Sequence, residues 1–347
     1  MLGGFLKKLS QKKDRIVSVD FGSSGLKVVS ARLQDRVIEI NHITIANYAS
    51  EKISSIIEVI ENPRLGHLVD IVWNYIPRGG GRICFIIPGR FVIVKKFTLP
   101  ATVSDVESYL QDRIKEELPF SLSEISFDFY TLPSEGELGV VCIVARRDIL
   151  KRCSSLLAET SYKVTYIDTA FSSLANLYNY NYPEETEEFV AIVDMGRVMT
   201  NVAFLKNGHL VFGQCLSEVQ GGLLDRTIAH RMGITPEEAE ERKINSAVPE
   251  DVLREALEEF CQDLTGQLWI LADRAEFPRI DKIYLTGGNA ALYTLKETLK
   301  NQMNCNVELL SPLKRFRISR EIDRVYLEEV SDRLSLALGG IVSSLQE

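Results

Sequence analysis

Residues 16–29 read IVSVDFGSSGLKVV, and this stretch indicates how the chain folds. A run of β-branched residues ends at Asp20, a short Gly/Ser turn follows, and a second β-branched run begins at Lys27. The pattern predicts a β-hairpin with a carboxylate at the edge of its turn. Small turn residues leave backbone N–H groups accessible to an anion such as phosphate, and Asp20 is placed to hold Mg²⁺ through water. Taken alone, the same pattern more often marks an ordinary turn.

A second stretch of the same form favours the ligand-binding interpretation. Residues 191–205 read AIVDMGRVMTNVAFL and place Asp194 half a chain length after Asp20. Two copies of one hairpin predict two similar domains that face each other across a cleft. The alternative for Asp194 is a turn carboxylate that only caps local N–H groups.

A third stretch completes the predicted site. Residues 282–290 read KIYLTGGNA and predict a strand, a turn at Gly287-Gly288 and a helix that begins there. Glycines at such a turn let the backbone approach a flat or anionic ligand. Two hairpins around the phosphates and a third loop over the adenosine predict a nucleotide site that works by positioning and charge.

The composition limits the class of protein. A length of 347 residues is enough for two domains, and 45% hydrophobic with 25% charged residues is ordinary for a globular chain. A net charge of −8 argues against a nucleic-acid surface. Scattered cysteines without a CxxC pair predict reduced, buried thiols in a cytoplasmic protein, and the dispersed histidines predict no zinc site. The start of the chain is interpreted as a frayed tail, with a membrane-surface tag as the alternative.

The remaining chain alternates predicted strands and helices. Ser104 and Glu107 predict a capping box that opens one helix, and Thr235 with Glu238 predicts another. Asn207-Gly208 predicts a tight hairpin turn. Strands are predicted over 37–45, 82–87, 91–99, 125–132, 138–145 and 164–167, and helices over 51–75, 104–118, 148–161, 168–178, 223–232, 249–274 and 334–345.

The linked order of these motifs resembles the actin-like ATPase superfamily, and in detail the family of type IV pilus assembly protein PilM. The resemblance covers nearly the whole chain. It implies an α/β, two-lobed actin-like fold, which is a duplicated ribonuclease H-like fold, with an inserted α+β subdomain. The implied parts are an N-terminal tail (1–15), a first lobe (16–88, continued by 165–188 and the C-terminal helix 331–347), an insert of the FtsA/PilM type (89–164) and a second lobe (189–330) with a helical subdomain at about 223–280.

The resemblance also implies ATP and Mg²⁺ as cofactors and, at most, weak ATPase activity. Asp20 and Asp194 are the implied Mg²⁺ residues, acting through water. Arg197 and Val198 stand where the family usually has small residues, so their bulk hinders the phosphates or Arg197 itself donates to them. The implied nucleotide-binding residues are Gly22, Ser23, Ser24, Lys27, Gly196, Thr200, Gly221, Gly222, Glu240, Lys243, Gly287, Gly288 and Asn289.

The implied partner is the N-terminal cytoplasmic peptide of an inner-membrane pilus protein similar to PilN, held in a groove beside the insert. The resemblance further implies self-association into a ring and a cytoplasmic location at the inner face of the inner membrane, reached through that partner. Two alternatives remain: a nucleotide-free scaffold similar to GspL of type II secretion, and a kinase of the sugar-kinase branch. The kinase needs a substrate base and a sugar-binding set, and the sequence offers no candidate for either.

Overall fold

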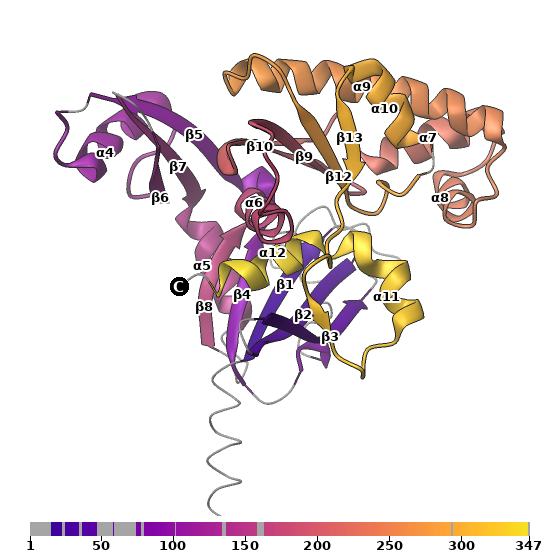
Figure 1. Cartoon of the computed structure of the whole chain (residues 1–347), viewed down its shortest axis with the longest axis horizontal. Coiled ribbons are helices and arrows are strands. Elements are labelled where there is room, and N and C mark those ends of the chain that lie inside the picture. The colour runs from indigo at the N-terminus through magenta and orange to yellow at the C-terminus, as the bar shows by residue number, and fades with distance from the viewer. Residues whose placement is uncertain are drawn as a thin grey trace, which may run out of the picture.

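The computed structural model describes residues 15–22, 25–34, 37–46, 58, 74–77, 80–100, 102–133, 137–157, 163–292 and 294–345. Residues 1–14 of the predicted tail, Ser23 and Ser24 of the first turn, and nearly all of the helix predicted over 51–75 lie outside these ranges. Figure 1 shows the described chain as two sheets, one above the other, with two helices between them and a smaller unit at the upper left.

The first sheet contains the first predicted hairpin. Its strands, in spatial order, are β14 (Arg317–Ile318), β3 (Val37–Ala46), β2 (Gly25–Gln34), β1 (Arg15–Gly22), β4 (Arg82–Ile87) and β8 (Lys163–Thr169). β1 and β2 are antiparallel, and β1 and β4 are parallel. Every residue of β1 between its two ends is buried, as expected for the β-branched run of a strand covered on both faces.

The second sheet repeats this arrangement. It begins with the meander β9 (Phe189–Met195), β10 (Thr200–Lys206) and β11 (His209–Leu216), and β12 (Lys282–Thr286) and β13 (Asn306–Leu309) lie beyond β9. β12 is parallel to β9, as β4 is to β1. The predicted turn at Asn207-Gly208 is confirmed, with φ values of 49° and 77° that Asn and Gly tolerate best. The predicted duplication is therefore visible in the strand order of both sheets.

The predicted insert continues the second sheet. After the short 3₁₀ turn η2 (Gly89–Phe91), strands β5 (Val92–Leu99), β7 (Leu138–Arg146) and β6 (Ile125–Leu132) form an antiparallel unit with its own apolar core. Helices α4 (Val106–Glu117) and α5 (Arg147–Leu157) accompany these strands. β5 joins β11 through a single pair, Val94 with Gly213. Tyr130 of β6, which donates to the Leu210 carbonyl, and the ion pair of Lys96 with Glu276 add further contacts between this unit and the rest of the second lobe.

Two helices form the layer between the sheets (Figure 1). α12 (Ser335–Ser343) packs on β1, β2 and β4, whereas α6 (Ala170–Asn181) packs on β10 and β11 of the second sheet and also on β4 and β8 of the first. The helices touch closely at Gly339, where an added Cβ would lie 2.0 Å from the carbonyl oxygen of Ser173. The two sheets are coupled through this layer, because α6 contacts both of them.

The other helices surround the second sheet and the C-terminal segment. They are α7 (Gly221–Met232), α8 (Pro236–Ile244), α9 (Glu250–Arg274), α10 (Leu295–Met303), α11 (Arg324–Val330) and the 3₁₀ turn η3 (Ser331–Arg333). Among the described residues, no helix is both long and apolar enough to cross a membrane.

Some local predictions are confirmed and others are wrong. The capping box of Thr235 and Glu238 on α8 is present. The Ser104 box is wrong, because Asp105 is the N-cap of α4 and accepts from the backbone N–H of Ser108. A carboxylate one residue later therefore replaced the predicted hydroxyl.

Two predicted helix starts are also wrong. The residues after Gly287-Gly288 form turns, and the helix begins only at Leu295. Asp168 still lies in β8, and Thr169, the last residue of that strand, caps α6, which begins at Ala170. The lobe boundaries stay a prediction, although β14, which lies within the predicted second lobe, pairs with β3 of the first sheet.

Candidate functional site

The first hairpin contributes a buried ion pair. Cross-strand register places Asp20 of β1 opposite Lys27 of β2, and the Lys27 Nζ lies 3.2 Å from the Asp20 Oδ2. Both side chains are less than a tenth exposed. Gly22 leaves room for the ammonium group, since a Cβ there would lie 1.9 Å from the Lys27 Nζ. The strand register thus places a cation and a carboxylate next to each other near the end of the hairpin.

The second hairpin places a carboxylate near this pair. Asp194 at the end of β9 is buried, and Asn201 on β10 donates to its Oδ2 at 3.1 Å. Burial raises the pKa of Asp194 to about 6, the negative charge of Asp20 raises it as well, and Asn201 and Lys27 lower it. Charged groups of the first hairpin are therefore among those that act on the Asp194 carboxyl group of the second.

The turn between β9 and β10 is tied to helix α7. The N–H of Gly196 donates to the Met199 carbonyl at 3.0 Å, and the N–H groups of Gly221 and Gly222 donate to the carbonyls of Gly196 and Arg197 at 2.9 and 2.8 Å. The predicted residues Gly221 and Gly222 thus begin α7, and their N–H groups are already satisfied. The role of Gly221 is to let Asn289 approach the start of α7, because a Cβ on Gly221 would lie 2.0 Å from the Asn289 amide nitrogen.

The third predicted loop reaches the same place. Gly287 has φ of +91°, and a Cβ there would lie 2.8 Å from the Asp194 Oδ1 and 2.6 Å from the Met195 carbonyl oxygen. Only glycine fits this conformation and this approach. The Gly287 N–H donates to the carbonyl of Asp332 at 3.0 Å, which anchors the loop to the segment before α12.

Helix α8 supplies the remaining predicted side chains. Lys243 donates to the Asn289 Oδ1 at 2.7 Å and forms a buried ion pair with Asp225 of α7. Glu240 forms an ion pair with Arg197, with 2.9 Å between the Glu240 Oε2 and the Arg197 Nη1. Burial lowers the pKa of Arg333, and the charges of Tyr326 and Glu240 raise it.

The structure brings most of the predicted residues together and adds others. Thr200 is fully buried at the start of β10, and Gly288 lies beside Arg333, whose Cγ is 3.7 Å from an added Cβ. Ser23 and Ser24 lie outside the described residues. Sequence reasoning missed Asn201, Asp225 and Arg333 as members of this cluster. Asn201 follows Thr200 directly, so its position was a usable signal, whereas the other two are identified only by their partners.

The residues fit a Mg²⁺-bound nucleotide. Two buried carboxylates supply the oxygen ligands that Mg²⁺ prefers, and Lys27 supplies positive charge for phosphate. The Asn201 Oδ1 is buried without a hydrogen-bond partner among the described residues, so the site retains an unused polar group. Within the same part of the chain, no set of three or more His, Cys, Asp or Glu side chains could hold a metal by itself.

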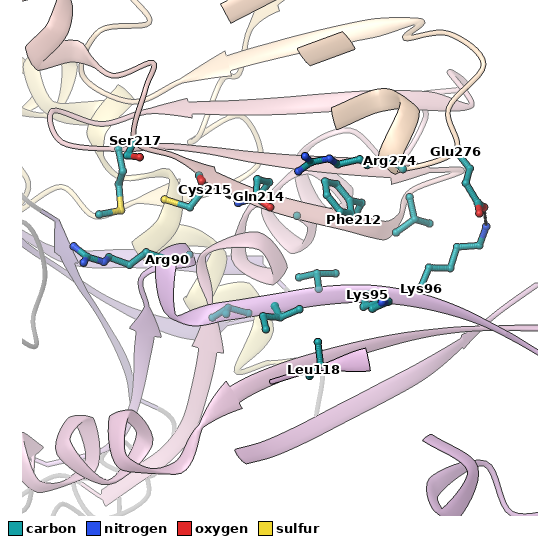
Figure 2. Close-up of a pocket in the computed structure, with 18 of the residues that line it drawn as sticks. Arg90, Lys95, Lys96, Leu118, Phe212, Gln214, Cys215, Ser217, Arg274 and Glu276 are labelled. Carbon is teal, nitrogen blue, oxygen red and sulfur yellow. Dashed lines mark hydrogen bonds and ion pairs between the residues drawn. The ribbon is translucent and has the colours of Figure 1, made fainter. Parts of the chain in front are cut away.

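A groove lies between the insert and the second sheet (Figure 2). Its volume is about 820 Å³, and the facing edges of β5 and β11 line it. Arg90 lies toward one end in Figure 2, and the ion pair between Lys96 and Glu276 lies at the other. Val198 and Met199, from the turn between β9 and β10, also line the groove. This turn therefore belongs to the walls of both the groove and the carboxylate site.

Comparison with known proteins identifies the family and the fold of this chain. The family model for type IV pilus assembly protein PilM matches residues 18–344. This chain belongs to the PilM family. The predicted family is thereby confirmed, and this PilM-family chain shares its fold with solved structures of low sequence identity. One is a PilM-PilN type IV pilus biogenesis complex, which matches with a TM-score of 0.77, 18% identity, and coverage of 96% of this chain and 99% of that one.

Two further structures extend the likeness to actin-like proteins. The ethanolamine utilization protein EutJ from Carboxydothermus hydrogenoformans matches with a TM-score of 0.53 and 14% identity, over 94% of this chain and 89% of that one. Ta0583, an archaeal actin homolog in complex with ADP, matches with a TM-score of 0.51 and 14% identity, over 96% of this chain and 99% of that one. The predicted two-lobed actin-like fold is therefore confirmed for this member of the PilM family.

Proposed function

We propose that this chain is a nucleotide-binding scaffold of the type IV pilus machine. In this proposal Mg²⁺ and ATP bind between the two hairpins, and the groove beside β5 holds the cytoplasmic N-terminal peptide of a PilN-like inner-membrane protein. The partner keeps the scaffold at the inner face of the membrane, where copies of it assemble into a ring. The observation that carries the nucleotide part is the close approach of Gly287 in the third loop to the buried Asp194 of the second hairpin.

The site supports binding by position and charge. Asp20 and Asp194 would hold the water shell of Mg²⁺, and Lys27 would contact phosphate. Glu240 and Lys243 on α8, with Asn289 beside Gly221, would surround the adenosine. In bound Mg-ATP, Mg²⁺ would provide positive charge for Asp20 and the phosphates negative charge for Lys27, two groups that otherwise pair with each other. The ADP bound in the archaeal actin homolog supports nucleotide as the ligand class.

The groove supports an extended peptide as the second ligand. β5 and β11 are paired only at Val94 and Gly213, so their edges diverge beyond that pair and leave backbone groups for a further strand. Strand addition to such an edge takes its affinity from main-chain hydrogen bonds and its specificity from alternate side chains. The solved PilM-PilN complex supports a PilN-like protein as the source of the peptide.

One observation favours a second candidate, a scaffold that needs no nucleotide. Within the site, Lys27 pairs with Asp20, Arg197 with Glu240, and Lys243 with Asp225. These three cations of the site are thus already paired with carboxylates of the protein itself. In that case the groove would bind its peptide equally well with and without ATP.

Titration of the purified chain with Mg-ATP tests the nucleotide part. The variants Asp20→Ala and Lys27→Ala should each lose about 1–3 kcal/mol of binding free energy, which is roughly five- to a hundred-fold in Kd. Lys300→Ala, an exposed position on α10, is the matched control and should bind as the wild type does. Absence of binding at millimolar ATP, or equal affinity in all four proteins, removes the nucleotide part.

Capture of a synthetic PilN-type N-terminal peptide tests the scaffold part. Gln214→Trp places an indole in the groove and should abolish capture, because Gln214 is one of its lining residues. Gln262→Trp, on the exposed face of α9, is the control with the same change of volume. The scaffold proposal fails if both variants capture the peptide as the wild type does. Enhanced capture with ATP favours the nucleotide-dependent form, and equal capture favours the nucleotide-free form.

A further inference from the structure

Arg197 occupies a rigidly held position at the mouth of the nucleotide site. Its carbonyl accepts the Gly222 N–H at 2.8 Å, and the preceding Gly196 is bonded to both Met199 and Gly221. A Cβ on Gly196 would lie 2.7 Å from the Met199 carbonyl oxygen, so this turn is as tight as glycine permits. The backbone of Arg197 is therefore fixed, and only its side chain is free to change partners.

The Arg197 side chain reaches across to helix α8. It meets Glu240 with 2.9 Å between the Nη1 and Oε2 atoms, and about a third of each side chain is exposed. The Glu240 carboxylate therefore ties helix α8 to the turn between β9 and β10.

This ion pair competes with a nucleotide for both of its members. A carboxylate accepts hydrogen bonds from hydroxyl groups, such as those of ribose, only with lone pairs that no guanidinium occupies. A guanidinium carries five donors in a planar fork that matches phosphate. A nucleoside offers a new partner to Glu240 alone, whereas a nucleoside phosphate offers new partners to Glu240 and to Arg197.

We propose that the ion pair of Arg197 and Glu240 is a latch over the nucleotide site, and that Arg197 makes binding depend on the phosphates of the ligand. A nucleotide opens the latch because its ribose takes Glu240 and its phosphates take Arg197. The proposal rests on the proposed function and names the residue that selects among ligands of that site.

Binding of adenosine and of Mg-ATP to the wild type and three variants tests the latch. Arg197→Ala should tighten adenosine binding about two- to fivefold, because a partly exposed ion pair no longer competes. The same variant should lower the ratio of ATP to adenosine affinity by at least about tenfold, because a charge-assisted phosphate contact is lost. Glu240→Gln should raise that ratio, since it releases Arg197 and keeps an acceptor for ribose. Arg242→Ala, exposed on the same helix, should change neither affinity.

A measurement without nucleotide gives an independent readout. Hydrogen exchange of the α8 amides should be faster in Arg197→Ala than in the wild type and in Arg242→Ala, because the latch holds this helix to the turn. Circular dichroism checks that every variant is folded. The latch is wrong if Arg197→Ala changes neither the adenosine affinity nor the ATP affinity. It is also wrong if this variant keeps both the ratio of the two affinities and the hydrogen exchange of α8 that the wild type has.

The outcomes separate this inference from the proposed function. If the wild type binds ATP and Arg197→Ala keeps the same ratio, the latch is wrong and the proposed function stands. If only Arg197→Ala binds ATP, Arg197 obstructs the phosphates instead of contacting them, and the latch is wrong. If no variant binds either ligand, the latch and the nucleotide part both fail, and peptide capture then decides the scaffold part separately.

Discussion

Asp194→Asn should stabilise the nucleotide-free protein at alkaline pH. The carboxyl group is buried, and its pKa is raised from 3.8 to about 6. Between these two values the folded state binds more protons at this site than the unfolded state does. The contribution of Asp194 to the free energy of unfolding therefore falls as pH rises through this window and stays low above it.

The size of the effect follows from the shift. A pKa raised from 3.8 to about 6 corresponds to about 3 kcal/mol that the ionised carboxylate costs the folded state above pH 7. Asparagine keeps the shape of the group without its charge, so the variant should gain up to that amount at pH 8 and almost nothing at pH 4. With a urea m-value of about 3 kcal/mol/M, the gain moves the unfolding midpoint by about 1 M.

Urea unfolding followed by circular dichroism at both pH values measures this gain. Asp263→Asn, on the exposed face of α9, removes a carboxylate without burial and should leave the midpoint in place. The reasoning is refuted if Asp194→Asn lowers the midpoint at pH 8, or shifts it equally at both pH values. The same variant should weaken Mg-ATP binding, which would show that the carboxylate is kept at a cost in stability.

Three further predictions concern the packing and charge around the site. Gly287→Ala should lower the melting temperature and abolish ATP binding, because its φ of +91° and the nearby Met195 backbone exclude a Cβ; an unaltered melting temperature would contradict this. Gly339→Ala should cost at least about 1–3 kcal/mol in urea unfolding, because the crossing of α6 and α12 has no space for a methyl group, and a smaller loss would mean that the helices separate readily. Lys282→Met should make the urea unfolding midpoint depend less on pH in acid. Burial by itself would raise the pKa of Glu185, but Lys282 helps to lower it from 4.5 to about 2. Their pairing therefore stabilises the fold above pH 4.5 and is lost as pH falls toward 2. A parallel pH profile of midpoints for wild type and variant would argue against that pairing.

Local chemistry explains why both hairpins were predictable. β-branched runs on either side of a turn that contains glycine select strand, turn and strand within a few positions, as at Asp20 and at Asp194. The Thr235 box on α8 is equally local, since its side chain and backbone partners lie within one turn. The shift of the α4 cap to Asp105 shows the limit of such signals, because neighbouring residues offered two competing acceptors.

The chain order of these signals was enough to predict the duplication, the insert and the family. Interactions between distant segments required the tertiary structure. The pairing of β5 with β11, the ion pair of Arg197 with Glu240 and the contact of Gly287 with Asp194 join residues that are far apart in the chain. A single sequence carries no signal for such partners, because each side chain is compatible with many of them.

Residue types and short spacings thus determined where strands, turns and helix starts form, since backbone conformation depends on neighbours along the chain. The tertiary structure alone decided which groups remain available to a ligand. The N–H groups of Gly221 and Gly222 and the charge of Lys27 are already used within the protein. Burial and pairing are properties of the packed molecule, and they govern the pKa of Asp194 and the free energy with which any ligand enters the site.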